Sequence, residues 1–340
     1  MSTTLPERER VDDKPTPTPR PINKTFTGVD AIFAQGARAV GATVLIITGG
    51  VGLFLGYQGY PTLQRYGWSF FTEREWNPEA DVIGIAAVLL GTIVIATVAM
   101  TMAFPLALLT ALYISEYAPP RLKPTLVSIV DLMAAVPSVV YGLWGALLIM
   151  EYASQFALFV DRTLGWIPIF DVVGGNPDAP APTISRYSFS AFCAAIAVAM
   201  MVTPMACAVM RQVFSQTPPG EKEAALALGA TRWGMIRSVV LPFGRGGIIG
   251  GSMLGLGRAL GETIAVVLIL STTFEFKVRP FELGGNSVSA LIANRFAEAD
   301  GNQLSALLAA GFVLFLITLV INTLAAMVVN RSRSGAGTDA

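Results

Sequence analysis

The chain has 340 residues, of which 53% are hydrophobic and only 14% are charged, and its formal net charge is zero. Soluble domains carry about 25% charged residues, so this is the composition of a membrane protein, and the balanced charge gives no indication of nucleic-acid binding. The sequence contains no histidine, which excludes histidine metal ligands, histidine general bases and histidine pH switches.

The N-terminal segment, residues 1–27, is polar, rich in proline and of mixed charge. This composition predicts a disordered tail. No apolar core follows its first basic residues within the usual length of a signal peptide, so the segment does not have the pattern of one.

Runs without charged residues mark the expected membrane spans. Five such runs are mostly apolar, and a sixth is rich in glycine but contains Arg258 and Glu262; in chain order the six are 39–64, 82–115, 132–150, 187–210, 246–270 and 301–330. A bilayer core of about 30 Å takes roughly 20 residues of helix. Because a backbone in lipid must satisfy its polar groups internally, the sequence predicts an all-α, polytopic membrane protein with six transmembrane helices.

The distribution of Lys and Arg predicts the orientation. The N-terminal tail, the segment after the second span, residues 211–245 and the C-terminal end carry most of the cationic residues. Because such residues stay on the inner side, we expect both termini in the cytoplasm. The chain then divides into a cytoplasmic tail (1–27), a first transmembrane helix with an external loop (28–82), a transmembrane core (83–330) with a cytoplasmic segment at 215–245, and a C-terminal cytoplasmic tail (331–340).

The third and fourth spans carry few polar groups. Pro137 and Ser138 interrupt the third span; such a proline more often kinks a helix while the serine satisfies the freed backbone, although the Ser138 hydroxyl is also a candidate group on a transport path. Asp131 is expected at the start of that span, where the helix dipole stabilises a carboxylate. A helical fourth span would hold Cys193 and Cys207 about 21 Å apart, too far for a disulfide.

Two segments are expected outside the membrane. Residues 151–188 have the composition of turns, whereas residues 287–299 have helical spacing and either lie on the outer surface or dip into the protein. Both are open to two interpretations, as simple connections or as contacts for an external partner.

A segment of mixed charge, EAALALGATRWGMIRSVVLP at 223–242, separates the fourth and fifth spans. It places Gly229 four residues after Ala225, and we interpret its final Leu241-Pro242 as a stop. The spacing resembles the EAA loop of ABC importer permeases, with Val239 where that pattern usually has Ile. The resemblance implies a short helix-turn-helix that docks onto an ATPase through Glu223, Ala224, Ala225, Gly229, Leu241 and Pro242.

The fifth span places small and charged residues on one stripe. Gly247, Gly251, Gly255, Arg258 and Glu262 fall within about 80° of one another on a helix that turns 100° per residue. A small residue at every fourth position lets another backbone approach closely, so we expect the three glycines to pack against a helix, near a partner subunit or a transport path. Arg258 and Glu262, at i and i+4, are expected to face away from lipid and are close enough to pair.

Two interpretations of Arg258 and Glu262 stay open. One is a structural ion pair that helps the helix to pack. The other is an anion site on a transport path, because a planar guanidinium offers a fork of donors that fits two oxygens of an oxyanion. Glu262 would then accept a hydrogen bond from the hydroxyl group of hydrogen phosphate, which sulfate lacks.

Residues 241–266, LPFGRGGIIGGSMLGLGRALGETIAV, resemble the PstC type of membrane subunit of the Pst phosphate importer, as does AVPSVVYGLWG at 135–145. The likeness covers roughly residues 83–330. It implies the fold of a type I ABC importer permease in a bacterial plasma (inner) membrane. It also implies that Arg258 and Glu262 take part in phosphate passage.

The same resemblance implies partners. These are a second, related permease of the PstA type, two ATPase subunits of the PstB type that bind ATP and Mg, and an external phosphate-binding lipoprotein or periplasmic protein of the PstS type. On the chain itself we expect no cofactor, because it lacks a G-x-x-x-x-G-K-[ST] phosphate loop. We also expect no metal site, since no spaced cluster of ligands occurs.

Three alternatives to a phosphate permease remain at this stage. The first is a permease for another oxyanion, namely sulfate, molybdate or phosphonate. The second is a transporter that needs no ATPase, against which the docking segment argues. The third, a membrane enzyme, lacks any nucleophile with a base beside it.

Overall fold

The computed structural model describes residues 28–172 and 184–333. The expected tail at 1–27, the part 334–340 of the expected tail at 331–340, and the part 173–183 of the segment expected as turns lie outside the described residues. The elements up to residue 172 are α1 Val29–Tyr66, α2 Ser69–Thr72, β1 Trp76–Asn77, β2 Val82–Ile83, α3 Ala86–Leu112, η1 Tyr113–Tyr117, α4 Lys123–Ala135, α5 Ser138–Trp144, η2 Gly145–Ile149 and α6 Met150–Leu164. Those after it are η3 Ile184–Arg186, α7 Ala191–Ser215, α8 Pro219–Ala227, α9 Arg232–Met235, η4 Ile236–Val240, α10 Leu241–Gly261, α11 Ile264–Ile269, α12 Val288–Arg295 and α13 Gly301–Arg333.

Six helical stretches of the described chain are long and apolar enough to cross a membrane, which confirms the predicted number. They are Val29–Tyr66, Ala86–Tyr117, Ser138–Leu164, Ala191–Ser215, Arg232–Gly261 and Gly301–Met327. The chain divides into two compact units, residues 1–50 and 51–340. In the described part of the first unit, nearly every side chain of α1 is exposed.

The core of the second unit forms around α7, which is more buried than any of the other five stretches. Alanines recur at every fourth position of α3, at residues 99, 103, 107 and 111, and all four are fully buried. Small side chains at this spacing let α3 and α7 approach closely along their length. The same unit contains the end of α1, where Gly59 leaves room for the backbone of Ala309 in α13.

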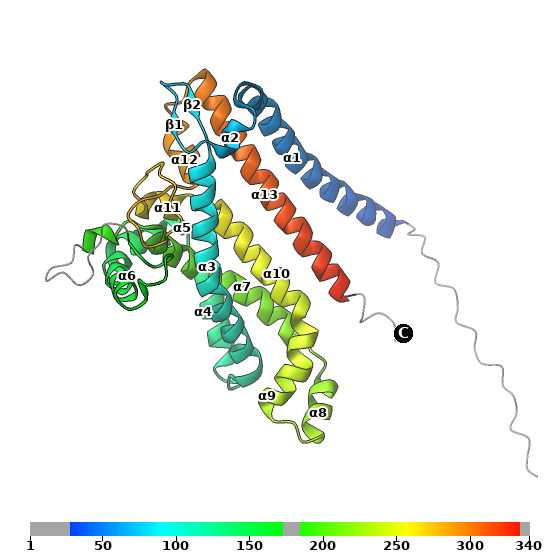
Figure 1. The fold of residues 1–340 in the computed structure, drawn as a ribbon. Coiled ribbons are helices and arrows are strands. Elements are labelled where there is room, and N and C mark those ends of the chain that lie inside the picture. The colour runs from blue at the N-terminus through cyan, green and yellow to red at the C-terminus, as the bar shows by residue number, and fades with distance from the viewer. Residues whose placement is uncertain (1–27, 173–183, 334–340) are drawn as a thin grey trace, which may run out of the picture. The chain divides into compact units, whose positions relative to one another are not determined.

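The connecting segments lie at opposite ends of the second unit (Figure 1). One end holds α8 and α9, and the other holds α12 and the two-stranded antiparallel sheet, in which Trp76 pairs with Ile83 and Asn77 with Val82. The helix predicted within 287–299 is confirmed as α12, which dips into the protein, since Val288 and Leu291 are fully buried.

The third span differs from the prediction in its bounds. The helix expected over 132–150 is broken at Val136, whose ψ of 131° is extended, so α4 ends at Ala135 and α5 begins at Ser138. Pro137 therefore interrupts the helix rather than kinking it, and the carbonyl of Met133 accepts from the Tyr141 hydroxyl at 2.8 Å and from the Val136 amide at 3.3 Å.

Asp131 also lies elsewhere than predicted. It is in the last two turns of α4, not at a helix N-terminus, and its carboxylate pairs with the Arg211 guanidinium of α7 at 3.2 Å. The Asp131 carboxylate is therefore stabilised by the ion pair with Arg211 and not by a helix dipole. The wrong boundary followed from starting the span where the charge-free run starts.

Residues 151–164 were predicted as turns, and this too is wrong, because α6 continues the third span to Leu164. Its charged residues are accommodated individually: Glu151 is exposed, while Asp161 is buried and accepts a hydrogen bond from the Tyr187 hydroxyl at 2.6 Å. Burial and this hydrogen bond raise the pKa of Tyr187.

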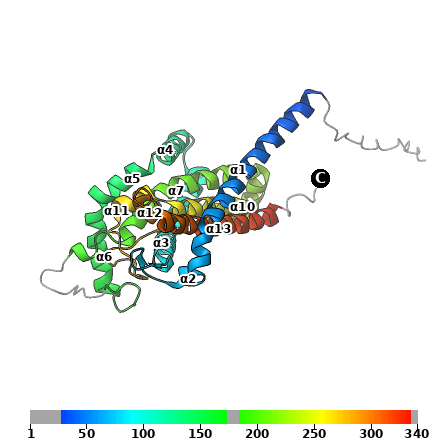
Figure 2. The ribbon, with the colours of Figure 1, turned by 90° about the horizontal axis from the view of Figure 1, so that it is seen from above.

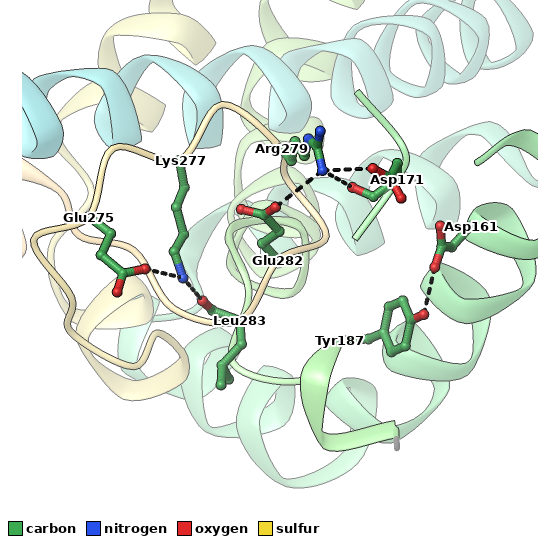
Figure 3. A network of polar contacts seen from close by, with 8 residues as sticks. All are labelled: Asp161, Asp171, Tyr187, Glu275, Lys277, Arg279, Glu282 and Leu283. Atoms are coloured by element: carbon green, nitrogen blue, oxygen red, sulfur yellow. Dashed lines mark hydrogen bonds and ion pairs between the residues drawn. The ribbon is translucent and has the colours of Figure 1, made fainter. Parts of the chain in front are cut away.

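Polar contacts fix the two segments that were expected outside the membrane, and the ion pair of Arg279 with Asp171 joins them to each other (Figure 3). The Arg279 guanidinium contacts the carboxylates of Asp171 at 2.8 Å and Glu282 at 3.6 Å. Lys277 pairs with Glu275 at 3.0 Å and donates to the Leu283 carbonyl. The loop before α12 is thereby fixed against the end of the third span.

Candidate functional site

The segment 215–245 folds as two short helices joined by a tight turn. Gly229 ends α8 with a φ of +86°, a conformation that favours glycine. The amide of Ala230 donates to the Ala225 carbonyl at 3.1 Å, and that of Gly229 donates to the Leu226 carbonyl at 2.9 Å. This pair of bonds is the Schellman motif, which satisfies the last carbonyls of a helix. The Thr231 hydroxyl then caps α9 by accepting from the Gly234 amide at 3.1 Å.

The turn presents apolar side chains to its surroundings. Glu223 and Ala224 are exposed on α8, and Leu226, Leu228 and Trp233 are 45%, 90% and 54% exposed. Ala225 instead packs inward, against a cluster that includes residues of α3 and α7. The helix-turn-helix is thus fixed on the core and has an uncovered apolar surface at its tip.

Leu241 and Pro242 do not stop the helix, contrary to the prediction. They begin α10, which continues without a gap from α9 through the π-helical segment η4. Proline is tolerated in the first turn of a helix, and the wider π turn of η4 directly precedes it. Leu241 packs partly against the core, whereas Pro242 is exposed.

Contacts with the end of α3 hold the two helices in place. Lys222 of α8 pairs with Glu116 of η1 at 2.6 Å, and the Glu116 side chain is only 6% exposed. The Arg232 guanidinium of α9 lies 5.6 Å from the centroid of the Tyr117 ring, at the distance of a cation–π contact. Sequence reasoning missed these residues, because nothing in the sequence indicates that 116 and 222 meet.

The three glycines of the fifth span pack against α7 of the same chain. A Cβ at Gly247 would lie 2.5 Å from the Val213 side chain, and one at Gly255 would lie 2.7 Å from that of Val202. At Gly251 it would lie 3.0 Å from the carbonyl oxygen of Ala206. Side chains at these positions would push α10 and α7 apart.

A bulky residue on this face should therefore prevent correct packing. Inserting a side chain into a packed contact costs about 1–3 kcal/mol, so we expect Gly251→Leu and Gly255→Leu to lower the yield of folded protein several-fold. Gly250→Leu is the matched control, because a Cβ at Gly250 meets nothing within 4 Å. Size-exclusion yield and thermal unfolding in detergent measure the effect, and equal tolerance at all three positions would contradict it.

Arg258 and Glu262 do not form the predicted i, i+4 pair. The helix α10 ends at Gly261, and Glu262 has an extended ψ of 129°. Glu262 is buried, and its carboxylate accepts from the Ala265 amide at 3.2 Å at the start of α11. Its carbonyl accepts from the Ser289 hydroxyl at 2.7 Å. The buried carboxylate therefore caps a helix, and within the described chain neither residue forms an ion pair.

Arg258 is exposed and lines a cavity of about 590 Å³ between α7, α10 and α13. The helices α10 and α13 run side by side in both views (Figure 1 and Figure 2). We call this the Arg258 cavity; its other lining residues are Met205, Leu254, Gly257, Gly261, Gly311, Leu314, Phe315, Thr318 and Asn322. Arg258 is the only charged residue among them, and neither Ser138 nor Glu262 belongs to the set.

A cavity with one guanidinium and apolar walls suits a small anion. The low dielectric of such walls strengthens the attraction between the cation and an anionic guest. Thr318 and Asn322 supply further polar groups, and sequence reasoning missed both. Their signal was available, since a threonine and an asparagine one turn apart stand inside the charge-free run 301–330.

Comparisons with known proteins agree with this architecture. Residues 103–334 match the family described as "Binding-protein-dependent transport system inner membrane component". A phosphate transport system permease protein PstC 2 from Mycobacterium tuberculosis is 36% identical over 300 residues, covering 87% of this chain and 90% of that protein. PstC proteins from Xylella fastidiosa and Haemophilus influenzae are 35% and 32% identical, covering 94% and 92% of this chain and 96% of each relative.

Solved structures show the same fold. A chain of a bacterial ABC transporter involved in the import of the acidic polysaccharide alginate superposes with a TM-score of 0.55 at 17% identity, covering 88% of this chain and 96% of that chain. The same type of transporter in complex with its alginate-bound periplasmic protein gives 0.55 at 16% identity, covering 87% and 93%. The chain belongs to the binding-protein-dependent transport system inner membrane components and, within them, to the PstC-type permease family.

Proposed function

We propose that this chain forms one half of the pathway through which an ATP-driven importer carries inorganic phosphate into the cell. The observation that carries the proposal is the Arg258 cavity, which places a single guanidinium between membrane-spanning helices. An uncompensated cation in a span is unfavourable by about 2.5–3.5 kcal/mol on insertion scales, so it marks function rather than packing. The names of the relatives supply the identity of the anion.

ATP is proposed to act through α8 and α9. Leu226, Leu228 and Trp233 form an uncovered apolar tip there, beside Glu223 and Ala224, and an exposed cluster of this kind is typical of a protein interface. Its proposed occupant is one of two PstB-type ATPase subunits, which hold the ATP and Mg. In this proposal the tip and both termini of the chain lie in the cytoplasm.

Two further partners complete the proposed complex. A PstA-type permease is proposed to face the Arg258 cavity and to close the pathway, because the cavity is open in the isolated chain and its arginine is exposed. A PstS-type phosphate-binding protein contacts the external end of the second unit, where Arg279 and Lys277 fix the loop before α12. That fixed loop supports the proposal, since a preformed surface loses little entropy on binding.

Reconstitution of the complete complex in liposomes tests the function. We expect ATP hydrolysis and phosphate uptake to rise together when the phosphate-loaded binding protein is added, and sulfate to cause neither. Stimulation by sulfate, molybdate or phosphonate instead of phosphate would favour another oxyanion permease. Uptake of phosphate in the absence of ATP would contradict the ATP-driven mechanism.

The ion pair between Lys222 and Glu116 is proposed to transmit movement of α8 to α3. The pair is partly buried, and a substitution that reverses one of its charges leaves two like charges in contact, so Lys222→Glu and Glu116→Lys should each reduce phosphate uptake per ATP hydrolysed. The reversed pair carrying both changes should recover most of the ratio. Glu221→Lys is the matched control, because Glu221 is the exposed neighbour on α8. An unchanged ratio in both single variants would show that the pair transmits nothing.

A further inference from the structure

The Arg258 cavity contains two polar side chains besides the guanidinium, and both come from α13. Thr318 and Asn322 are one turn apart, so they face the same side of that helix. The Asn322 amide lies over Gly257: a Cβ at Gly257 would be 3.4 Å from the amide oxygen and 3.8 Å from the nitrogen. These are ordinary van der Waals distances, so the amide lies directly beside the residue that precedes Arg258.

The hydrogen-bonding capacity of these two groups is only partly used within the protein. The Thr318 hydroxyl donates to the Phe315 carbonyl at 2.9 Å, which uses its proton and leaves its oxygen free to accept. No described residue forms a hydrogen bond with the Asn322 side chain, which is exposed to the cavity and offers a carbonyl acceptor and an amide donor.

The cavity therefore combines a cationic donor with neutral acceptors. The Arg258 guanidinium can only donate hydrogen bonds, whereas the Thr318 oxygen and the Asn322 carbonyl can accept a hydrogen bond from a hydroxyl group. Glu262, the acidic residue at the end of the same span, does not line the cavity, and its carboxylate accepts instead from the Ala265 amide in α11. The guest that satisfies all of these groups is an oxyanion that carries its own hydroxyl.

We propose that Asn322 and Thr318 determine specificity by accepting hydrogen bonds from the two hydroxyl groups of dihydrogen phosphate while Arg258 binds its charged oxygens. The inference rests on the proposed function and assigns to these two residues the role that the sequence suggested for Glu262. Sulfate at neutral pH has no hydroxyl, so its oxygens would face acceptors without a proton between them. A site that binds a substrate hydroxyl strongly rejects the analogue that lacks it.

Two substitutions in the reconstituted complex test the proposal. Thr318→Val keeps the shape of the side chain and removes the acceptor, and Asn322→Leu removes both polar groups of the amide. Two concentrations are measured: the sulfate concentration that halves phosphate-stimulated ATP hydrolysis, and the phosphate concentration that gives half-maximal stimulation. The result is the ratio of the first concentration to the second. We expect this ratio to fall about tenfold in either variant, since one hydrogen bond to a charged guest is lost.

Thr323→Val is the matched control. The Thr323 hydroxyl makes the same kind of bond, to the Leu319 carbonyl at 2.7 Å, but Thr323 does not line the cavity. Its ratio should equal that of the unmodified protein. Co-purification of all subunits checks assembly, and if Asn322→Leu fails to assemble, Thr318→Val alone decides.

The outcomes separate this inference from the proposed function. An unchanged ratio in the assembled variants, with phosphate still transported, overturns the role of Asn322 and Thr318 and leaves the importer intact. A loss of assembly confined to Asn322→Leu, with an unchanged ratio in Thr318→Val, would assign the amide to contact with the partner permease. Absence of phosphate transport in the unmodified complex would instead refute the proposed function itself.

Discussion

Replacing Arg258 with glutamine is expected to lower phosphate uptake by about 10- to 100-fold while the complex still assembles. The guanidinium is the only charge of the Arg258 cavity, and hydrogen bonds to charged groups contribute about 1.5–3 kcal/mol each. Assembly should survive, because Arg258 is exposed in the chain and no described residue pairs with it. Uptake of labelled phosphate into liposomes, with co-purification of the subunits, measures both quantities.

Two further variants test whether uptake requires the guanidinium group itself or only a positive charge in this region. Arg258→Lys retains the charge but not the planar fork of donors, so it should recover only part of the uptake. Exchanging the two charges, with Arg258→Glu and Glu262→Arg together, should not restore uptake, because the structure separates the residues into different environments. Recovery of uptake in the exchanged variant would show that the two residues form a structural ion pair and would contradict an anion site at Arg258.

Replacing Gly229 with tryptophan is expected to abolish phosphate-driven ATP hydrolysis with little effect on membrane insertion. The φ of +86° is strained for any L side chain, at a cost of about 1–2 kcal/mol. A Cβ at this position meets nothing within 4 Å in the chain itself. A loss larger than the backbone strain explains must therefore arise in a subunit that docks onto the turn.

The matched control is Gly229→Asn, since asparagine tolerates the left-handed conformation better than other residues and has a small side chain. It should retain most activity, and Gly229→Ala should lie between the two. Co-purification of the ATPase with each variant distinguishes loss of docking from loss of coupling. Normal ATP hydrolysis and uptake in Gly229→Trp would exclude the turn from the interface.

The number and approximate places of the spans could be predicted because apolar runs have to be long enough to cross the bilayer. Their interruptions could not. The break at Glu262 depends on the Ser289 hydroxyl, which reaches its carbonyl from a helix 27 residues away in sequence. The continuation of α6 past Glu151 was missed because absence of charge was taken as the boundary, although an exposed carboxylate near a span end is tolerated.

The candidate site was only partly predictable for a related reason. Arg258 and Gly229 could be identified locally, one as a charge in a span and the other as a turn glycine. Asn322 and Thr318 come from the last span, and their position beside Arg258 follows from how α13 packs on α10. The sequence of a single helix shows which of its residues share a face, but it does not show which other helix packs against that face and supplies the remaining groups of a site.

The interruptions at Val136 and Glu262 set how the third and fifth spans can bend. A continuous helix stretches hydrogen bonds on one side when it bends, whereas these two residues already have extended ψ angles of 131° and 129°. The helices α5 and α11 beyond them touch closely, with a Cβ at Gly142 only 2.9 Å from the Ala265 Cα. Rotation about the backbone bonds of these two residues would therefore tilt α5 and α11 together and leave the hydrogen bonds within α4 and α10 intact, at the expense of the bond between the Ser289 hydroxyl and the Glu262 carbonyl.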